Sequence, residues 1–338
     1  MIYPKEKLEQ LRHRWATTKG KKLIKTIKTS RCYLSPVLFR GKVKNFPFIN
    51  DPEVEDGIDL RGIPVSGYDF RVPIKEDDGD FTEEIAILSN IHLEGATLKH
   101  CNFEEGKIHN CFFEDADLSH AGFKNATLNT CNFQQADCLG MDVNSTKLID
   151  CNFSDANIKD MTTAMTILDQ KTTFGRELKS EKERNYHFAS IEYKQIKEMY
   201  KNSSLHDFAD RCHCKEMAAK RKISKRTNPM RWLNYIFGDV LCKYGTSYLR
   251  VLLASTIIMV TCAAFYTKYD SLLYYSQKIE SLSFADSLYF SIVTFTTLGY
   301  GDYHATNAMR FVAATESFVG AALMALFTVI IARTIIRD

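Results

Sequence analysis

The stretch Thr297-Leu298-Gly299-Tyr300-Gly301, followed by Asp302, decides how this chain is interpreted. Two glycines flank a tyrosine, and the whole stretch lies between two apolar segments. In an ordinary strand, successive residues alternate in direction. Pointing successive carbonyls at one axis requires backbone conformations that residues with a Cβ avoid and that Gly299 and Gly301 adopt readily. The stretch therefore predicts a row of aligned carbonyls, with a simple loop turn as the alternative.

The flanking segments predict a membrane-spanning arrangement. Residues 308–332 form an apolar run of 25 residues in which Arg310 and Glu316 are the only charges. At about 1.5 Å per residue, such a helix crosses a hydrocarbon core of about 30 Å with some tilt. Residues 248–266 are just long enough to span, whereas residues 284–296 are too short and fit a re-entrant helix. Irregular backbone at membrane depth is tolerated only where it is buried in protein or lines water.

The order of helix, short re-entrant helix, Gly-Tyr-Gly stretch and helix resembles the pore of two-transmembrane, prokaryotic-type potassium channels over residues 248–337. The resemblance implies a homotetramer with fourfold symmetry, in which main-chain oxygens replace the hydration shell of K⁺. The oxygen layers would be the carbonyls of Thr297, Leu298, Gly299 and Tyr300 together with the Thr297 hydroxyl, and Gly301 completes the motif. Leu298 stands where valine is commoner, and Ala305 stands where many relatives have proline.

The resemblance also implies residues that support this filter. Asp302 is expected behind its outer end, with Tyr289 as a candidate hydrogen-bond partner or, alternatively, an aromatic residue packed at an interface. A charged side chain is costly inside a membrane and is a functional hypothesis by default. We expect Glu316 to brace the re-entrant helix through Ser291 or Thr294 rather than to contact the ion.

The second spanning helix carries the candidate gate. Gly320 lies 19 residues after Gly301, which matches the hinge glycine of potassium-channel inner helices, with close packing as the alternative. Because glycine costs about 1 kcal/mol relative to alanine inside a helix, a bend is one reason to keep it. A stripe at near-helical spacing below it is expected to line the cavity and inner gate, or else to pack against a helix: Ala321, Met324, Thr328 and Ala332.

Charge asymmetry predicts the orientation. Residues 211–250 contain ten Lys or Arg against the two acids Glu216 and Asp239, and Arg333 and Arg337 follow the second helix. The loop at residues 267–283 is nearly neutral. The positive-inside rule then places both termini in the cytoplasm of a multi-pass protein of the cell (inner) membrane.

A period of five residues runs through the N-terminal half. Residues 86–160 form 15 consecutive pentads whose central residue is Leu, Phe, Ile, Val or Cys. They resemble the pentapeptide-repeat family, which implies a right-handed quadrilateral β-helix with four pentads per turn. Residues 20 apart must then stack. One interior ladder is expected to contain Phe113, Phe133 and Phe153, with Phe103 and Phe123 on the opposite face. A further column is expected to contain Cys111, Cys131 and Cys151 as core filler.

The fold class predicted overall is mixed, with a cytoplasmic β-helix, a helical linker and an α-helical membrane pore. The expected domains are residues 1–85 (a basic N-terminal segment and a lead-in or cap around 57–70), 86–160 (the solenoid), 161–246 (a helical hairpin and an interfacial helix) and 247–338 (the pore). The basic segment Lys5–Arg31 could contact anionic lipid or another subunit, or be simply solvated. Most of the ten cysteines lie in a reducing compartment, so disulfides are not expected. Metal binding at Cys212-His213-Cys214, near His206, is disfavoured because the spacing lacks the usual CxxC pairs.

These patterns favour a tetrameric K⁺-selective channel whose opening is biased by the solenoids. One alternative is a non-selective cation channel of the same fold. Another treats the solenoid as a protein-binding scaffold of the DNA-mimicking kind, although its 11 acids against 5 bases are only moderately acidic. K⁺ is the expected permeant ion and the bilayer the expected surroundings. No nucleic-acid partner and no enzymatic activity are expected, and the sequence identifies no regulatory ligand or cytoplasmic effector.

Overall fold

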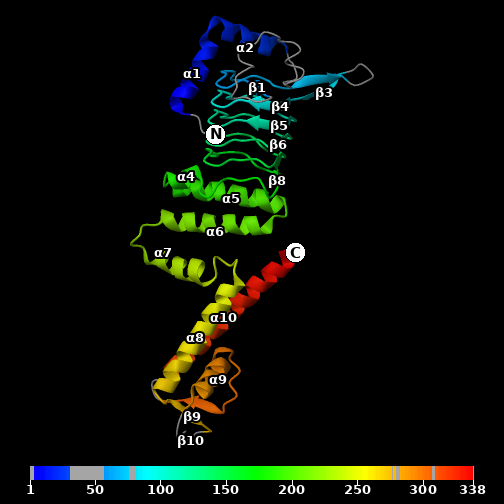
Figure 1. The fold of residues 1–338 in the computed structure, drawn as a ribbon. Coiled ribbons are helices and arrows are strands. Elements are labelled where there is room, and N and C mark those ends of the chain that lie inside the picture. The colour runs from blue at the N-terminus through cyan, green and yellow to red at the C-terminus, as the bar shows by residue number, and fades with distance from the viewer. Residues whose placement is uncertain are drawn as a thin grey trace. The chain divides into compact units, whose positions relative to one another are not determined.

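The computed structural model describes residues 4–30, 57–75, 81–275, 277–278, 282–306 and 309–337. The chain forms two compact units, residues 1–223 and residues 224–338 (Figure 1). Each unit has its own buried apolar core, and the two are described separately below.

The first unit is built on a solenoid with one six-stranded parallel face. The strands stack in the order β1 (Ile58–Asp59), β4 (Ile87–His92), β5 (Lys107–Phe112), β6 (Thr127–Asn129), β7 (Lys147–Ile149) and β8 (Ile167–Leu168). From β4 onward, paired residues are 20 apart, as in Ile108 opposite Leu128. The other faces are stacked by bridges with the same spacing, such as Asp117 opposite Asp137. The predicted pentapeptide β-helix is therefore confirmed.

The ladder of coils extends beyond both ends of the predicted repeat. At the N-terminal end, Ile58 pairs with Ile91 and Asp69 pairs with Asn102, 33 residues apart. The extra length contains the hairpin of β2 (Val72–Lys75) and β3 (Phe81–Ile85). The segment expected to be an irregular lead-in is thus itself a coil. At the C-terminal end, Asn152 pairs with Thr173 after a one-residue insertion.

Stacked phenylalanines fill the solenoid as predicted. The rings of Phe113, Phe133 and Phe153 stack with centroids 4.9 and 4.6 Å apart, and Phe174 continues the column at 5.3 Å. The facing column stacks Phe70, Phe103 and Phe123 at 4.5 and 4.6 Å. The two columns meet edge to face. The cysteine column is buried, and burial raises the pKa of Cys111 to about 12, which suits an inert core residue.

Two basic helices cap the N-terminal end of the stack: α1 (Lys5–Ala16) and α2 (Thr18–Ser30) (Figure 1). Their apolar faces join the solenoid core through Trp15, Leu23 and Ile27, and Leu8 and Leu11 are buried as well. Residues 5–30 of the predicted basic segment therefore cap the solenoid. Arg31, the last residue of that segment, lies outside the described residues. An amphipathic helix explains how a basic segment can pack on an apolar core, because only its apolar stripe is buried and its lysine-rich face stays outside.

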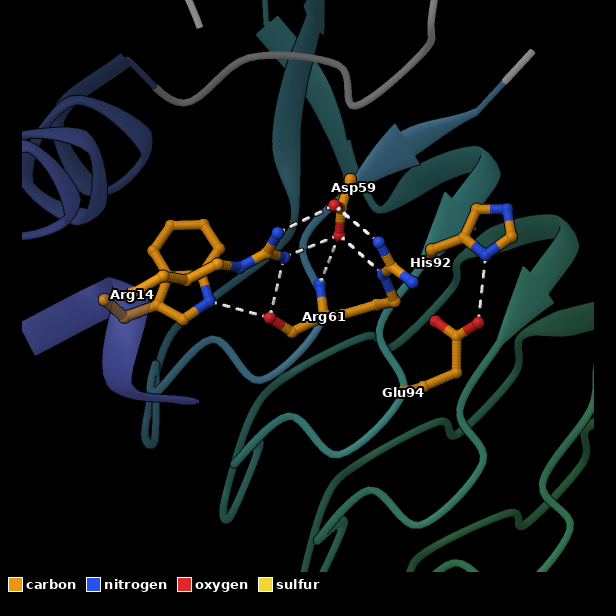
Figure 2. A network of polar contacts seen from close by, with 6 residues as sticks. Arg14, Asp59, Arg61, His92 and Glu94 are labelled. Atoms are coloured by element: carbon orange, nitrogen blue, oxygen red, sulfur yellow. Dashed lines mark hydrogen bonds and ion pairs between the residues drawn. The ribbon is translucent and has the colours of Figure 1, made fainter. Parts of the chain in front are cut away.

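A buried ion network fixes this cap, as Figure 2 shows. The Asp59 carboxylate accepts hydrogen bonds from the guanidinium groups of Arg14, at 2.7 and 2.5 Å, and Arg61, at 3.0 Å. The indole of Trp15 donates to the carbonyl of Arg61 at 2.7 Å. Burial acts to raise the pKa of Asp59, but the bonds from the two arginines outweigh it and hold that pKa below its usual value.

The opposite end of the solenoid is covered by α4 (Lys179–Lys182), α5 (Tyr186–Asn202) and α6 (His206–Ile223) (Figure 1). The predicted helical hairpin is present: its two helices pack together, and α5 packs on the last coil. Tyr200 donates to the carbonyl of Thr172 at 3.2 Å, and Leu168 donates through its backbone to Ser203 at 2.6 Å. The hairpin thus belongs to the first unit as a cap, which a solenoid needs at its open ends.

The second unit begins with α7 (Pro229–Leu233), which continues into a π-helix, η1 (Asn234–Leu241). Asn228 caps α7 by accepting from the backbone N–H of Met230 at 3.0 Å. In this part of the chain, where an interfacial helix was expected, three aromatic side chains are exposed: Trp232, Tyr235 and Phe237. The rest of the unit comprises α8 (Tyr248–Lys268), β9 (Leu272–Tyr274), β10 (Gln277–Lys278), α9 (Phe284–Phe295), β11 (Tyr303–Ala305) and α10 (Met309–Arg337).

Two helices of this unit, α8 and α10, are long and apolar enough to cross a membrane. Only 17% of the most apolar window of each is buried within the chain. The core helix of a soluble protein would be covered by its own chain, so these exposed apolar faces need lipid or neighbouring subunits. The short helix α9 packs against both long helices.

Candidate functional site

The short helix α9 delivers the Gly-Tyr-Gly stretch. Its first turn is capped by Ser283, which accepts from the backbone N–H of Asp286 at 3.1 Å and donates to the Asp286 carboxylate at 2.6 Å. At the other end, the N–H of Thr297 donates to the carbonyl of Thr294 at 3.1 Å, and that of Leu298 donates to Val293 at 3.0 Å. The first two residues of the stretch are therefore still hydrogen-bonded to the last turn of α9.

The backbone of the stretch alternates in handedness. Thr297, Gly299 and Gly301 have φ of +57°, +57° and +78°, whereas Leu298 and Tyr300 between them keep negative φ. Alternating left- and right-handed residues cancels the reversal of direction that a strand would give its carbonyls. A left-handed conformation is rare for a β-branched residue such as Thr297, and such outliers cluster at functional sites. Among the described residues, and apart from the two neighbours in sequence, no atom lies within 4 Å of a Cβ built on either glycine, so conformation and not space calls for glycine.

The outer end of the stretch is anchored by a small antiparallel sheet. The strand β11 pairs with β9, which also pairs with β10. The carbonyl of Asp302 accepts from the N–H of Tyr275 at 2.8 Å, and the Asp302 carboxylate accepts from the N–H of Tyr303 at 3.0 Å. The predicted partner Tyr289 lies close enough to interact with Asp302, and its ring packs on Tyr303 at 5.8 Å.

Sequence reasoning missed a second link from the stretch to α9. The hydroxyl of Tyr303 donates to the Asp286 carboxylate at 3.1 Å. Asp286 thereby joins the N-terminal end of α9 to the residue that follows Asp302. The pattern Ser283-x-x-Asp286 is a recognisable helix-start signal, but its tie to Tyr303 depends on the chain doubling back.

The buried acid Glu316 lies where α8, α9 and α10 meet. It is 3% exposed, and it contacts the hydroxyl groups of Ser291 on α9 and Tyr266 on α8, the latter at 2.7 Å. Of the two partners expected on α9, Ser291 is therefore the one that the structure brings to it. Tyr266 was not anticipated, because it comes from the other spanning helix.

Gly320 packs directly on the end of α9. A Cβ at this position would lie 2.1 Å from the carbonyl oxygen of Phe295, far inside contact distance. Close packing therefore accounts for this glycine, and α10 runs without interruption from Met309 to Arg337. The predicted stripe of Ala321, Met324, Thr328 and Ala332 is exposed in the single chain, and so faces away from α8 and α9.

Comparison with protein families decides what this unit is. Residues 248–337 match the family model described as ion channel. This part of the protein is an ion-channel domain. The match covers both spanning helices, the re-entrant helix and the alternating stretch, which marks the protein as a membrane protein.

The solenoid N-terminal to the channel domain matches a second family model, pentapeptide repeats, with eight copies over residues 98–135. Neither family is a family of enzymes. The protein therefore fuses a pentapeptide-repeat solenoid to a two-transmembrane channel domain, as the sequence predicted.

Three solved structures resemble the solenoid. A pentapeptide repeat protein from the cyanobacterium Cyanothece 51142 has 17% identity and a TM-score of 0.28, over 35% of this chain and 86% of its own. One from the Arabidopsis thaliana thylakoid lumen has 26% identity and a TM-score of 0.22, over 23% and 52%. HetL from Nostoc sp. strain PCC 7120 has 19% identity and a TM-score of 0.27, over 33% and 50%. The chain spans about half the length of the latter two. No curated protein matches the chain.

Metal-binding clusters are not found in the part of the chain that the structure describes. The segment Cys212-His213-Cys214, considered above, lies within helix α6. Burial raises the pKa of Cys212 to about 11, which makes its thiol a poor ligand and nucleophile.

Proposed function

We propose that the protein is a homotetrameric, K⁺-selective channel whose filter is the backbone of residues 297–301. The observation that carries the proposal is the alternating sign of φ along residues 297–301, positive at Thr297, Gly299 and Gly301, which lets successive carbonyls face one axis. Rings of such carbonyls can replace the hydration shell of K⁺. The sites for the ion would be formed by Thr297, Leu298, Gly299 and Tyr300.

Exposed side chains in the filter support a tetramer. Leu298 is 60% exposed and Tyr300 is 67% exposed in the single chain. Large apolar and aromatic side chains at membrane depth need packing partners, and one chain supplies carbonyls on only one side of an axis. Four copies around the axis would cover these side chains and close the ring.

Reconstitution into vesicles tests the proposal directly. The purified tetramer is expected to carry K⁺ in strong preference to Na⁺, and Gly299→Ala is expected to lower this flux by more than about tenfold, because alanine resists the left-handed conformation. Gly122→Ala is the matched control, since its Cβ meets only ordinary contacts at 3.6 Å or more and its φ is not in the left-handed range. Equal passage of Na⁺ and K⁺ would favour the non-selective alternative, and a monomer or trimer would refute the proposed pore.

The solenoid is proposed to bias opening of the pore. In the second unit, Arg333 near the end of α10 donates to the carbonyl of Gly245 at 3.1 Å, and Arg250 on α8 donates to the backbone carbonyl of Asp239 at 2.8 Å. These bonds connect α10 and α8 to the segment of residues 230–245, which follows the solenoid unit in the chain. An effector can act through this segment only if it binds two states of the protein with different affinity.

The orientation remains as the charge pattern predicts, with both termini in the cytoplasm and the filter mouth outside. A protein-binding scaffold is the second role that the solenoid could have beside gating. Both are separable by experiment, because only a gating role requires that removal of the solenoid change channel opening.

A further inference from the structure

A chain of hydrogen bonds joins the three helices of the channel domain at Glu316. Tyr266 and Ser291 are fully buried, and Glu316 is almost so. Tyr266 donates from α8 to one carboxyl oxygen of Glu316, and the other oxygen meets the hydroxyl of Ser291 on α9. The same hydroxyl lies 2.9 Å from the carbonyl oxygen of Met259 on α8, in donor geometry.

Counting hydrogens restricts how these contacts can be made. A serine hydroxyl has one hydrogen, so Ser291 can donate either to Met259 or to Glu316, but not to both. If Ser291 donates to Met259, its contact with Glu316 is a hydrogen bond only when Glu316 is the donor. Each hydroxyl hydrogen is then used once along the chain from Tyr266 to Glu316 to Ser291 to Met259, and the thiol of Cys262 is left as a further, weaker donor to Glu316.

The surroundings of Glu316 supply no compensating charge. Within the described residues, the groups that act on it are the hydroxyls of Ser291 and Tyr266 and the thiol of Cys262, and no cation is among them. An uncompensated carboxylate buried between membrane-spanning helices is costly, whereas a carboxylic acid with a donor and an acceptor role fits the site. The competing arrangement, with three donors to a carboxylate, leaves that charge without a partner of opposite sign.

We infer that Glu316 is a neutral carboxylic acid that positions the re-entrant helix α9 by joining α10 to α8 through Ser291. The inference rests on the proposed channel function, because its consequence is the placement of the filter that α9 carries. Glu316 is a positioning residue here and does not touch the ion. One turn further along α10, Gly320 touches the Phe295 carbonyl, so α9 is held at two points along its length.

The Glu316→Gln substitution distinguishes a neutral acid from a carboxylate at this position. In Glu316→Gln the amide N–H can donate to Ser291 while the amide carbonyl accepts from Tyr266, which reproduces the inferred arrangement. Glu316→Leu keeps a similar volume but can make neither bond. We expect Glu316→Gln to keep K⁺ flux within about twofold of the parent and Glu316→Leu to lose more than about tenfold, since it leaves buried polar groups unpaired. Thr315→Ala, which removes an exposed hydroxyl at the adjacent position, is the matched control.

Infrared spectroscopy reports the protonation state of Glu316 directly, which a purely structural role would not determine. The difference spectrum between the reconstituted parent and Glu316→Gln is expected to show loss of a carboxylic-acid C=O stretching band that shifts when glutamate is ¹³C-labelled. Loss of carboxylate bands instead would overturn the inference, as would equal impairment of Gln and Leu variants. The spectroscopic arm needs only the parent and the Gln variant. Its outcome is independent of ion preference, so failure of the K⁺ proposal and failure of this inference are distinguishable.

Discussion

At the scale of single residues, the solenoid places a left-handed residue at the fifth position of every pentad from Asn90 to Met165. Glycine, asparagine and aspartate tolerate this conformation, whereas a β-branched residue does so at a cost of about 1–2 kcal/mol. Thr130 has φ of +55° and an exposed side chain, whose hydroxyl donates to the side chain of its neighbour Asn129 at 3.0 Å. Thr130→Asn is therefore expected to raise the free energy of unfolding of the solenoid by about 1 kcal/mol. Thermal unfolding monitored by circular dichroism measures this change.

The reverse substitution provides the control for this position. Asn125 has φ of +59° at the equivalent place one pentad earlier and is also exposed. Asn125→Thr should lower the free energy of unfolding by about the amount that Thr130→Asn raises it, and so lower the unfolding temperature. A stabilisation by both variants, or by neither, would show that backbone conformation at the fifth position does not limit stability.

Glu114 makes solenoid stability depend on pH. Burial, with a contribution from the nearby Glu94, raises the pKa of Glu114 to about 7, and the amide of Asn132 donates to it at 2.5 Å. Because the folded state then binds a proton that the unfolded chain has released, stability is fully present below about pH 4.5 and falls as pH rises to about 7. Glu114→Gln is expected to remove this fall and to stabilise the protein at pH 8 by about 1–3 kcal/mol.

Unfolding in urea at pH 5 and at pH 8 tests this expectation on the full chain. Glu105→Gln, which changes an exposed acid of the same solenoid, should leave the pH dependence as it is in the parent. An unchanged difference between the two pH values in Glu114→Gln would assign the dependence to another group.

At the scale of elements, the helical hairpin closes the end of the solenoid. Tyr200 of α5 is 5% exposed, bonds to the Thr172 carbonyl and stacks on Phe208 of α6 at 5.3 Å. Removing a buried aromatic side chain costs about 3–5 kcal/mol. Tyr200→Ala should therefore expose the last coils, with faster amide hydrogen exchange in β7 and β8 than in β4. Ile191→Ala changes an exposed residue on the same helix and should leave exchange unaltered, and uniform acceleration along the solenoid would argue against a local cap.

The sequence predicts elements well where a short period repeats and poorly where one insertion breaks it. Leu60, Val65 and Phe70 keep the five-residue spacing, yet the β2–β3 hairpin changes the stacking distance from 20 to 33 and so disguises the first coil. The role of α1 was missed for another reason. Its apolar stripe is visible in sequence, but its partner Asp59 is 45 residues away from Arg14.

The same division holds in the channel domain. The two glycines mark the stretch proposed as the filter, because their conformational freedom is a local property. The bonds of Tyr303 to Asp286 and of Tyr266 to Glu316 join residues 17 and 50 positions apart. Such pairs follow from how three helices pack, and a single sequence gives no measure of that packing. Gly320 is intermediate, since its position was predicted and its close approach to Phe295 supports the packing alternative.

At the scale of the whole molecule, the chain contains two units that each have a core, joined near residue 224. The second unit includes both spanning helices, the proposed filter and the small sheet beside it, so it contains every part that the proposed conduction path needs. A protein reduced to residues 224–338 is therefore expected to keep its ion preference while its open probability changes, because the solenoid no longer biases the segment tied to α10 through Arg333 and Gly245. Single-channel recording of both forms in lipid bilayers measures the two quantities separately. An unchanged open probability would leave the solenoid with a scaffold role alone, and a changed ion preference would mean that the filter depends on contacts outside its own unit.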